Sequence, residues 1–499
     1  MEGSVAVPTP AGEPQLKAGA ISYISNVVIS VASTAPGYSL AATLGFIAAV
    51  GGIGLQSPAV ILVAFIPMGC IAAAYNYLNR ADPDCGTTFA WVSKAMGPRL
   101  GWMSGWAVFV ADILVMPSLA SIASSYTYQL FGWDHGANSV FWLTVGGIVW
   151  IVVMTAICYI GIELSARTQR ILLSLEVVTL AVFAVVALIK VYANSPAHSV
   201  KPAFSWFNPF AISSTSALVG GVLLAVFIYW GWDSGVSVNE ESEDSATGPG
   251  RAAVVSTFIL LAIYVIVATA AQAFGGTHSL VANQLDVFAP LGKGVRGSPF
   301  DKLLIIAVLT SASASTQTTI LPAARTTLSM ARHKALPGIF GRINPRYLSP
   351  DFSTIITGVL SCLVFVGLAV TSFDNLIADA FTSLALTICF YYGITGYACT
   401  WFYRHELTKS VKNFIWVGVM PTLGGLILTG VFVKAIVDYS KTDGGYAKPL
   451  FGIGSPVIIT MFSIGVGLIL LVWQWRREPE FFRQKAEVAD PAVLAEASA

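Results

Sequence analysis

The sequence predicts an all-α protein that crosses a membrane twelve times. Three observations support this fold class. Of the 499 residues, 55% are hydrophobic and only 11% are charged, whereas a soluble domain carries about 25% charged residues. The mean hydropathy is +0.73, so much of the surface must face lipid rather than water. The apolar residues also gather in segments of about 20, the length that a spanning helix needs.

Twelve such segments follow one another with mostly short turns between them, which leaves no room for a separate soluble domain. They are 21–50, 58–78, 101–130, 140–162, 171–192, 215–238, 252–274, 303–328, 354–370, 376–401, 414–437 and 457–475. We expect a five-helix unit over 21–192, a second over 213–401, and two additional helices over 413–475. Residues 1–20 are expected to form a disordered cytoplasmic tail, and 476–499 a cytoplasmic C-terminal tail.

Lys and Arg are distributed unevenly between the two sides of these segments. With the N-terminus inside the cell, 19 basic residues fall on the cytoplasmic side and 8 on the other. Cytoplasmic loops of membrane proteins carry an excess of Lys and Arg. The sequence therefore predicts a multi-pass protein of the plasma (inner) membrane, embedded in the lipid bilayer with both termini in the cytoplasm. The net charge of +1 gives no reason to expect nucleic acid as a partner.

The first segment is interrupted near its middle by Pro36 and Gly37. Proline lacks a backbone N–H and disfavours the helical conformation of the preceding residue, here Ala35. Glycine permits further unwinding. Because lipid cannot satisfy free backbone groups, a broken helix must line a cavity or be buried in protein. A ligand site is therefore one interpretation of this break, and a simple proline kink is the other.

The sixth segment contains a second interruption. Gly231 and Gly235 flank Asp233, with aromatic residues before and between them. The two interruptions lie in the first segments of two successive five-segment units, and breaks at matching positions indicate the binding site of a transporter. Half-helix N-termini can hold a carboxylate and half-helix C-termini an ammonium. This geometry suits a zwitterion such as an amino acid.

The eighth segment carries small or hydroxylated residues from 310 to 319. Such residues allow tight helix packing in membranes, and their hydroxyls can also line a site. Ser313 and Thr316 are candidates for a gate or a sodium site.

Carboxylates inside spanning segments are costly and are candidates for function. Asp112, Glu176 and Asp233 lie within the segments, and no Lys or Arg is expected beside them. Burial in apolar surroundings favours the protonated carboxyl group. Each acid is therefore a candidate for carrying a coupled proton, and Asp112 also for pairing with a cationic substrate. A structural, hydrogen-bonded role stays open for each of them. A fourth acid, Asp379, lies near an outer end and is expected instead to be a wetted surface acid.

An acidic cluster follows the sixth segment. Its members Glu240 and Glu241 are expected either to close an inner gate against Arg80, Arg99 or Arg332, or to be solvated.

Several function classes are disfavoured. All five histidines fall in expected loops and the six cysteines show no metal-like spacing, so no metal, cofactor or membrane-enzyme site is expected. No Gly-x-x-x-x-Gly-Lys motif occurs, which excludes an ATP-driven pump. Two asymmetric breaks without repeated pore loops disfavour a channel. A permease-like sensor stays open, and so does the oligomeric state.

The chain resembles the amino acid–polyamine–organocation (APC) superfamily of permeases over most of its length. The segments that carry the resemblance are 86–92, 96–97, 101–106, 159–167, 231–233 with 240–241, and 331–337. The resemblance implies a LeuT-like fold with inverted five-helix repeats, broken first and sixth helices, and two extra helices. It also implies alternating access around a substrate site at the two breaks, where the carboxylate and amine of the substrate would meet unwound backbone. Tyr229 and Trp230 are the implied gate aromatics.

The implied substrate-binding residues are Thr34, Ala35, Pro36, Gly37, Tyr38, Ile228, Tyr229, Trp230, Gly231 and Trp232. Two positions depart from the family pattern. Pro36-Gly37 stands where many relatives have Gly-x-Gly, and Glu176 stands where some relatives carry a lysine linked to proton coupling. We therefore expect a secondary transporter of an amino acid or related amine, proton-coupled and with a weak preference for a cationic substrate. An amino acid/polyamine exchanger is the alternative.

Overall fold

The computed structural model describes residues 14–295, 300–371, 373–441, 445, 447, 449 and 451–489. Parts of both expected tails, residues 1–13 and 490–499, lie outside these ranges. Within them the regular structure is helical, apart from two isolated bridges that pair Ile21 with Ser242 and Ile343 with Pro350.

Eleven helical stretches of the described residues are long and apolar enough to cross a membrane. The long helices are α1 (Tyr23–Thr34), α2 (Pro36–Ala49), α3 (Ser57–Ala81), α5 (Pro98–Leu130), α7 (Val140–Ile160), α8 (Ile162–Ala193), α9 (Thr215–Tyr229), α10 (Gly248–Ala282), α12 (Phe300–Arg332), α13 (Asp351–Thr371), α14 (Phe373–Phe402), α16 (Met420–Tyr439) and α17 (Ser455–Arg477). The short ones are α4 (Thr88–Met96), α6 (Asp134–Ala137), α11 (Phe288–Val295), α15 (Val411–Asn413) and α18 (Pro479–Phe482), with the 3-10 turns η4 (Trp232–Gly235) and η5 (Asn239–Glu241).

Twelve spans were expected, and the difference lies at the segment 376–401. This segment falls within α14, a helix of 30 residues that is not among the eleven stretches. Within this segment the side chain of Asp379 is 0% exposed, whereas the sequence led us to expect a wetted surface acid there. The side chains of residues 371–378 lie outside the description.

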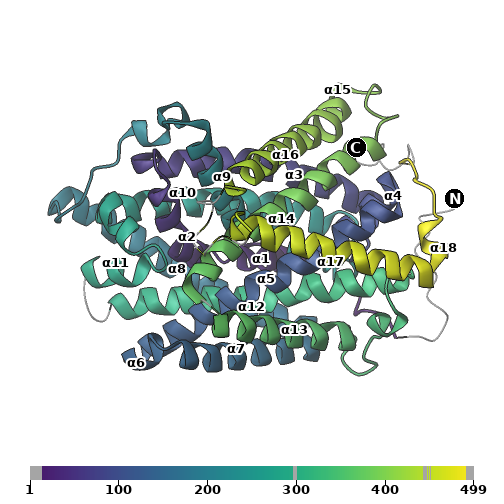
Figure 1. The fold of residues 1–499 in the computed structure, drawn as a ribbon, viewed down its shortest axis with the longest axis horizontal. Helices are drawn as coiled ribbons and strands as arrows, with labels where there is room; N and C mark the ends of the chain where they lie inside the picture. The colour runs from purple at the N-terminus through teal and green to yellow at the C-terminus, as the bar shows by residue number, and fades with distance from the viewer. Residues whose placement is uncertain are drawn as a thin grey trace.

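The long helices form one bundle with a buried inner set and an exposed outer set (Figure 1). In the most apolar stretch of α5, 89% of the residues are buried, and the same share holds for the stretch that contains α1 and α2. In α7 the share is 17%, and apolar side chains such as Val149 and Val152 are exposed. Exposed apolar side chains of this kind suit contact with lipid. The inner helices therefore include the two that the sequence predicts to be broken.

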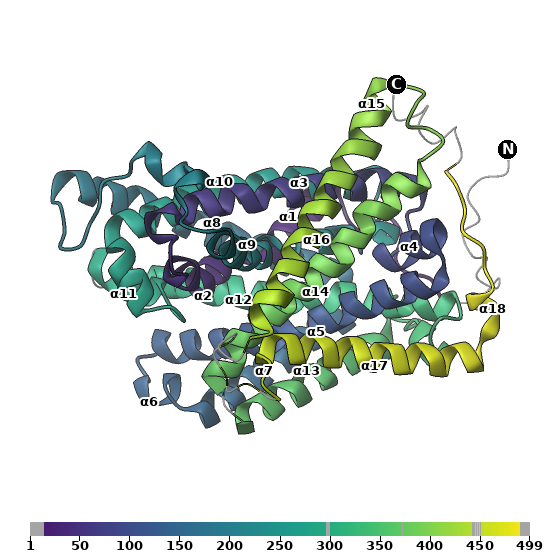
Figure 2. The ribbon, with the colours of Figure 1, turned by 45° about the horizontal axis from the view of Figure 1, so that its top comes forward.

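The two ends of the bundle differ. The end with α4 and α18, called the terminal end below, lies opposite the end with α6 and α11 (Figures 1 and 2). Both described chain ends dock at the terminal end. The N–H of Glu487 donates to the carbonyl of Lys94 at 2.7 Å, and the N–H of Ile21 donates to the carbonyl of Glu241 at 2.9 Å.

Candidate functional site

The first break lies between α1 and α2, where the sequence predicted it. Ala35 adopts a left-handed conformation with φ 47° and ψ 67°, and α2 begins at Pro36. The cause is local, because the proline ring excludes the helical conformation at the preceding residue. Ala35 is only 1% exposed. The unwound backbone therefore lies inside the protein, as the absence of water in a bilayer requires.

Two side chains from other helices hold the first turn of α2. The Gly37 N–H donates to Oε1 of Glu176 at 2.8 Å, and the Tyr38 N–H donates to Oγ of Ser311 at 3.0 Å. The Ser311 hydroxyl in turn donates to the same Oε1 of Glu176 at 2.8 Å. Glu176 comes from α8 and Ser311 from α12. The carboxylate thus lies at the N-terminus of a helix, where a negative charge is favoured.

The second break lies at the end of α9, again as predicted. The helix ends at Tyr229, and Gly231 has φ 114°, a conformation that glycine adopts without strain. The short turn η4 then places Asp233 in its first turn. The Tyr264 hydroxyl of α10 donates to the carbonyl of Ile228 at 2.6 Å and lies 3.4 Å from the carbonyl oxygen of Thr34. The hydroxyl group of one tyrosine therefore contacts backbone carbonyl oxygens at both breaks.

The two breaks are in direct contact. The hydroxyls of Ser33 and Ser234 are 2.7 Å apart, and the Ser315 hydroxyl of α12 donates to the carbonyl of Ser33 at 2.8 Å. A Cβ atom added at Gly231 would lie 2.9 Å from the Ser33 carbonyl carbon and oxygen. The breaks thus form a single site at the centre of the bundle.

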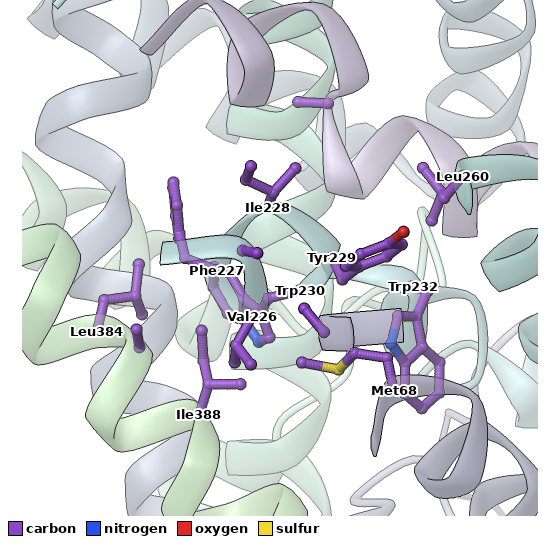
Figure 3. Close-up of a cluster of buried hydrophobic side chains, with 14 of the residues drawn as sticks. Met68, Val226, Phe227, Ile228, Tyr229, Trp230, Trp232, Leu260, Leu384 and Ile388 are labelled. Carbon is purple, nitrogen blue, oxygen red and sulfur yellow. The ribbon is translucent and has the colours of Figure 1, made fainter. Parts of the chain in front are cut away.

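The aromatic side chains of the second break point in different directions (Figure 3). Phe227 lies on the side of Leu384, and Tyr229 extends toward Leu260. The Tyr229 ring packs at right angles to that of Tyr264 with centroids 5.1 Å apart, so it faces α10.

Trp230, the other expected gate residue, faces α14. Its indole N–H donates to the Tyr391 hydroxyl. Trp232 stacks on the Tyr392 ring with centroids 5.2 Å apart, and its own N–H has no hydrogen-bond partner among the described residues. The break therefore leaves polar atoms of the aromatic residues available beside Asp233.

The three expected acids are all buried, at 1% exposure for Asp112, 0% for Glu176 and 8% for Asp233. The Tyr391 hydroxyl lies 3.5 Å from Oδ2 of Asp233, whereas Oδ2 of Asp112 has no hydrogen-bond partner among the described residues. Among the described ion pairs none involves these acids. The site is therefore acidic without a basic counterpart.

Of the two expected hydroxyls in the eighth segment, neither forms a hydrogen bond with a break among the described residues. The Thr316 hydroxyl donates to the carbonyl of Ala312 in its own helix at 2.8 Å, and the Ser313 hydroxyl has no partner among the described residues. The hydroxyls that reach the first break are those of Ser311 and Ser315. They are four residues apart and so share one face of α12, a signal that was readable in the sequence.

A cavity of about 490 Å³ opens at the end with α6 and α11. Its lining includes Ser118, Asp286, Lys293 and Phe381. The Ser118 hydroxyl lies 2.7 Å from that of Tyr38, next to the first break. The Phe381 ring packs against Phe227 of α9 with centroids 5.0 Å apart. The cavity therefore reaches side chains that adjoin both breaks.

Ion pairs close the terminal end. Arg325 donates two hydrogen bonds to Glu241, at 2.7 and 3.0 Å, and the two side chains are 1% and 0% exposed. Burial raises the pKa of Glu241, and the neighbouring Arg325 counteracts this. Arg332 pairs with Glu240 at 2.7 Å, as one of the expected alternatives. The partner of Glu241 is Arg325, which was not among the expected arginines.

One group of possible metal ligands lies at the same end. Side-chain ligand atoms of Asp84, Cys85 and Glu240 are within 4.8 Å of one another. Asp84 already accepts a hydrogen bond from Ser329, and Glu240 already pairs with Arg332. Two of these side chains therefore already take part in the contacts that close the terminal end.

Replacing Tyr264 by phenylalanine should destabilise the protein by about 1–3 kcal/mol, the cost of leaving a buried carbonyl without its donor. The Ile228 carbonyl would lose the hydroxyl that now lies 2.6 Å away. The melting temperature of the purified protein in detergent measures the effect. Tyr397→Phe is the matched control, because that hydroxyl bonds Thr429 at an exposed site. Equal melting temperatures for the two variants would contradict the bridging role.

Comparison with known proteins gives a consistent result. A family model described as amino acid permease matches residues 20–441. The chain is 24% identical over 451 residues to the arginine/ornithine antiporter of Latilactobacillus sakei, covering 84% of this chain and 90% of that protein. It is 20% identical over 378 residues to the low-affinity putrescine importer PlaP of Escherichia coli K12, covering 76% and 80%.

Among solved structures, the crystal structure of MhsT in complex with L-phenylalanine matches with a TM-score of 0.62 at 16% identity. The match covers 84% of this chain and 99% of that one. At this identity the likeness concerns the fold, which is the expected LeuT-like fold.

Proposed function

Because the chain belongs to the amino acid permease family, we propose that it carries a cationic amino acid or amine by alternating access, with a proton as the coupling ion. The family and the relatives make the chain a multi-pass secondary transporter of amino acids or polyamines rather than an enzyme. The proposal rests on the arrangement of residues at the centre of the bundle. There two helix breaks meet, Glu176 contacts the first and Asp233 lies in the second, while Asp112 is buried in α5. No described Lys or Arg pairs with these acids. A buried acidic site without a base requires either protons or a cationic ligand.

The two ends of the bundle support a state that is open on one side. The terminal end is closed by Arg325, Glu241, Arg332 and Glu240, whereas the cavity opens at the opposite end. From the distribution of Lys and Arg we propose that the terminal end, with both termini, lies in the cytoplasm. The membrane that the transporter crosses is then the plasma membrane. On this assignment the structure faces outward.

The proposed architecture has twelve spans, with α14 as the tenth. Residues 21–192 and 213–401 would form the two inverted five-helix units, followed by the two helices of 413–475. The left-handed break at Ala35 and the break at Gly231 occupy the first span of each unit, which supports this division.

Asp112 is the candidate for proton coupling that the geometry favours. Its Oδ2 is buried without a hydrogen-bond partner among the described residues, so it can take up either a proton or a hydrogen bond from an ammonium group. Because protonation removes the negative charge that attracts an ammonium group, proton and substrate binding would be linked. Glu176 and Asp233 are the alternative carriers, and a sodium site at Ser313 and Thr316 is the alternative coupling site.

The test is uptake of labelled arginine, ornithine and putrescine into proteoliposomes, with and without an inward proton gradient. We expect accumulation that the gradient stimulates, and we expect Asp112→Asn to lose the stimulation. Asp301→Asn is the control, because that half-buried side chain lies at the start of α12, where its Oδ1 accepts a hydrogen bond from the neighbouring Lys302 N–H.

Other outcomes distinguish the alternatives. Uptake only into preloaded liposomes would indicate an exchanger, the activity in the name of the antiporter relative. No uptake of any compound, together with a ligand-induced rise in melting temperature, would contradict transport and leave a permease-like sensor. Stimulation by sodium in place of protons would move the coupling site to Ser313 and Thr316.

A further inference from the structure

Every backbone donor of the first break already has an acceptor inside the protein. The Ala35 N–H donates to the carbonyl of Ala32 at 3.1 Å, and the Ser39 N–H to that of Ala35 at 2.8 Å. Pro36 has no N–H. The remaining donors, at Gly37 and Tyr38, bind Glu176 and Ser311 as described above. A substrate carboxylate that arrived at this break would therefore find no free backbone donor between residues 35 and 39.

The carboxylate of Glu176 fits this position closely. Its side chain is 0% exposed, and a Cβ atom added at Gly37 would lie 3.4 Å from Oε1. Glycine at position 37 thus allows the carboxylate to approach the backbone. The second oxygen, Oε2, is buried and has no hydrogen-bond partner among the described residues. That oxygen can accept a hydrogen bond from a ligand that donates, such as an ammonium group.

The second break also carries its own carboxylate. Asp233 lies in the first turn of η4. In their ionised forms Asp233 and Glu176 would repel a substrate carboxylate, because like charges at short range in a buried site interact strongly. An ammonium group would be attracted by both of them.

We propose that Glu176 occupies the place of a substrate carboxylate, and that the substrate is a primary amine without an α-carboxylate, such as a linear diamine. This inference rests on the proposed transport function and specifies its substrate class. Glu176 is then a specificity-determining residue. It accepts the hydrogen bond of the Gly37 N–H directly, it holds the Ser311 hydroxyl that accepts from the Tyr38 N–H, and it thereby rejects compounds that need these two donors.

The experiment compares pairs of compounds that differ only in the carboxylate: putrescine with ornithine, cadaverine with lysine, and agmatine with arginine. Uptake into proteoliposomes and competition for uptake give the half-saturation concentration of each. We expect the amine of each pair to be preferred by at least about tenfold, the equivalent of one charge-assisted hydrogen bond. Equal or tighter binding of the amino acids would overturn this inference and leave the proposed transport function intact. If none of the six compounds is transported or raises the melting temperature, both fail.

Glu176→Gln keeps an acceptor oxygen for Gly37 and Ser311 but removes the negative charge. The ratio of amine to amino acid uptake should then fall by roughly tenfold. A role limited to holding the helix would lower uptake of both compounds and leave their ratio unchanged, and this result would overturn the assignment of specificity to Glu176. Glu163→Gln in the same helix is the control, because Glu163 is exposed and pairs with Lys17 at the surface.

Discussion

Replacing Gly231 by valine should reduce uptake to background while the protein still inserts into the membrane. Gly231 has φ 114°, where a β-branched residue is strained, and this costs about 1–3 kcal/mol. The added side chain would also begin 2.9 Å from the backbone of Ser33 and would force the two breaks apart. Uptake into proteoliposomes measures the loss, and size-exclusion chromatography in detergent measures the folded fraction.

The controls for this variant separate the site from the fold. Gly430→Ala places a methyl group in α16 where no heavy atom lies within 4 Å, so uptake should be unchanged. Gly231→Ala should be intermediate, because alanine shares the backbone strain but adds less bulk. Normal uptake by Gly231→Val would contradict the placement of the site at the junction of the breaks.

Removing either partner of the buried ion pair should strongly destabilise the protein. Glu241→Leu would leave Arg325 as a buried charge without a partner, and Arg325→Met would leave Glu241 in the same condition. Breaking a buried pair from one side costs about 3–5 kcal/mol. Both single variants should therefore melt well below the parent protein.

The double variant supplies the decisive comparison. Replacing both partners by apolar residues removes both buried charges, and such a change is often neutral. We expect Glu241→Leu with Arg325→Met to recover most of the melting temperature lost by each single variant. Additive losses would show instead that the two side chains stabilise the terminal end independently. Lys334→Gln, which breaks an exposed pair with Glu480, should leave the melting temperature unchanged.

The positions of the breaks could be predicted because their signals are local. Proline acts on its immediate neighbour and glycine on its own dihedral angles, so Ala35 and Gly231 were located from the residues around them. The residues at which the spans begin and end were harder to predict. The helix α8 begins at Ile162 rather than near 171, because its first turns carry charged residues that the apolar pattern excludes.

The partners of the site could not be predicted, because they depend on contacts between helices far apart in the sequence. Glu176 was identified as a buried acid, but its contact with Gly37 joins residues 139 positions apart. Tyr264 and Tyr391 were not expected, since a tyrosine in a spanning helix has no local feature that indicates its partner. Arg325 lies near the end of the expected segment 303–328, and no local feature of the sequence indicates that it pairs with Glu241 and is only 1% exposed.

The closed terminal end has a consequence for turnover. Opening it would transfer the Arg325–Glu241 and Arg332–Glu240 side chains from mutual contact into water. The hydration free energy that each charge regains offsets the attraction that it gives up, because burying an ion pair costs about as much as the pairing returns. The closed and opened forms can therefore lie near each other in free energy. A carrier that passes through both forms in every cycle is then not trapped in either form by a large difference in free energy.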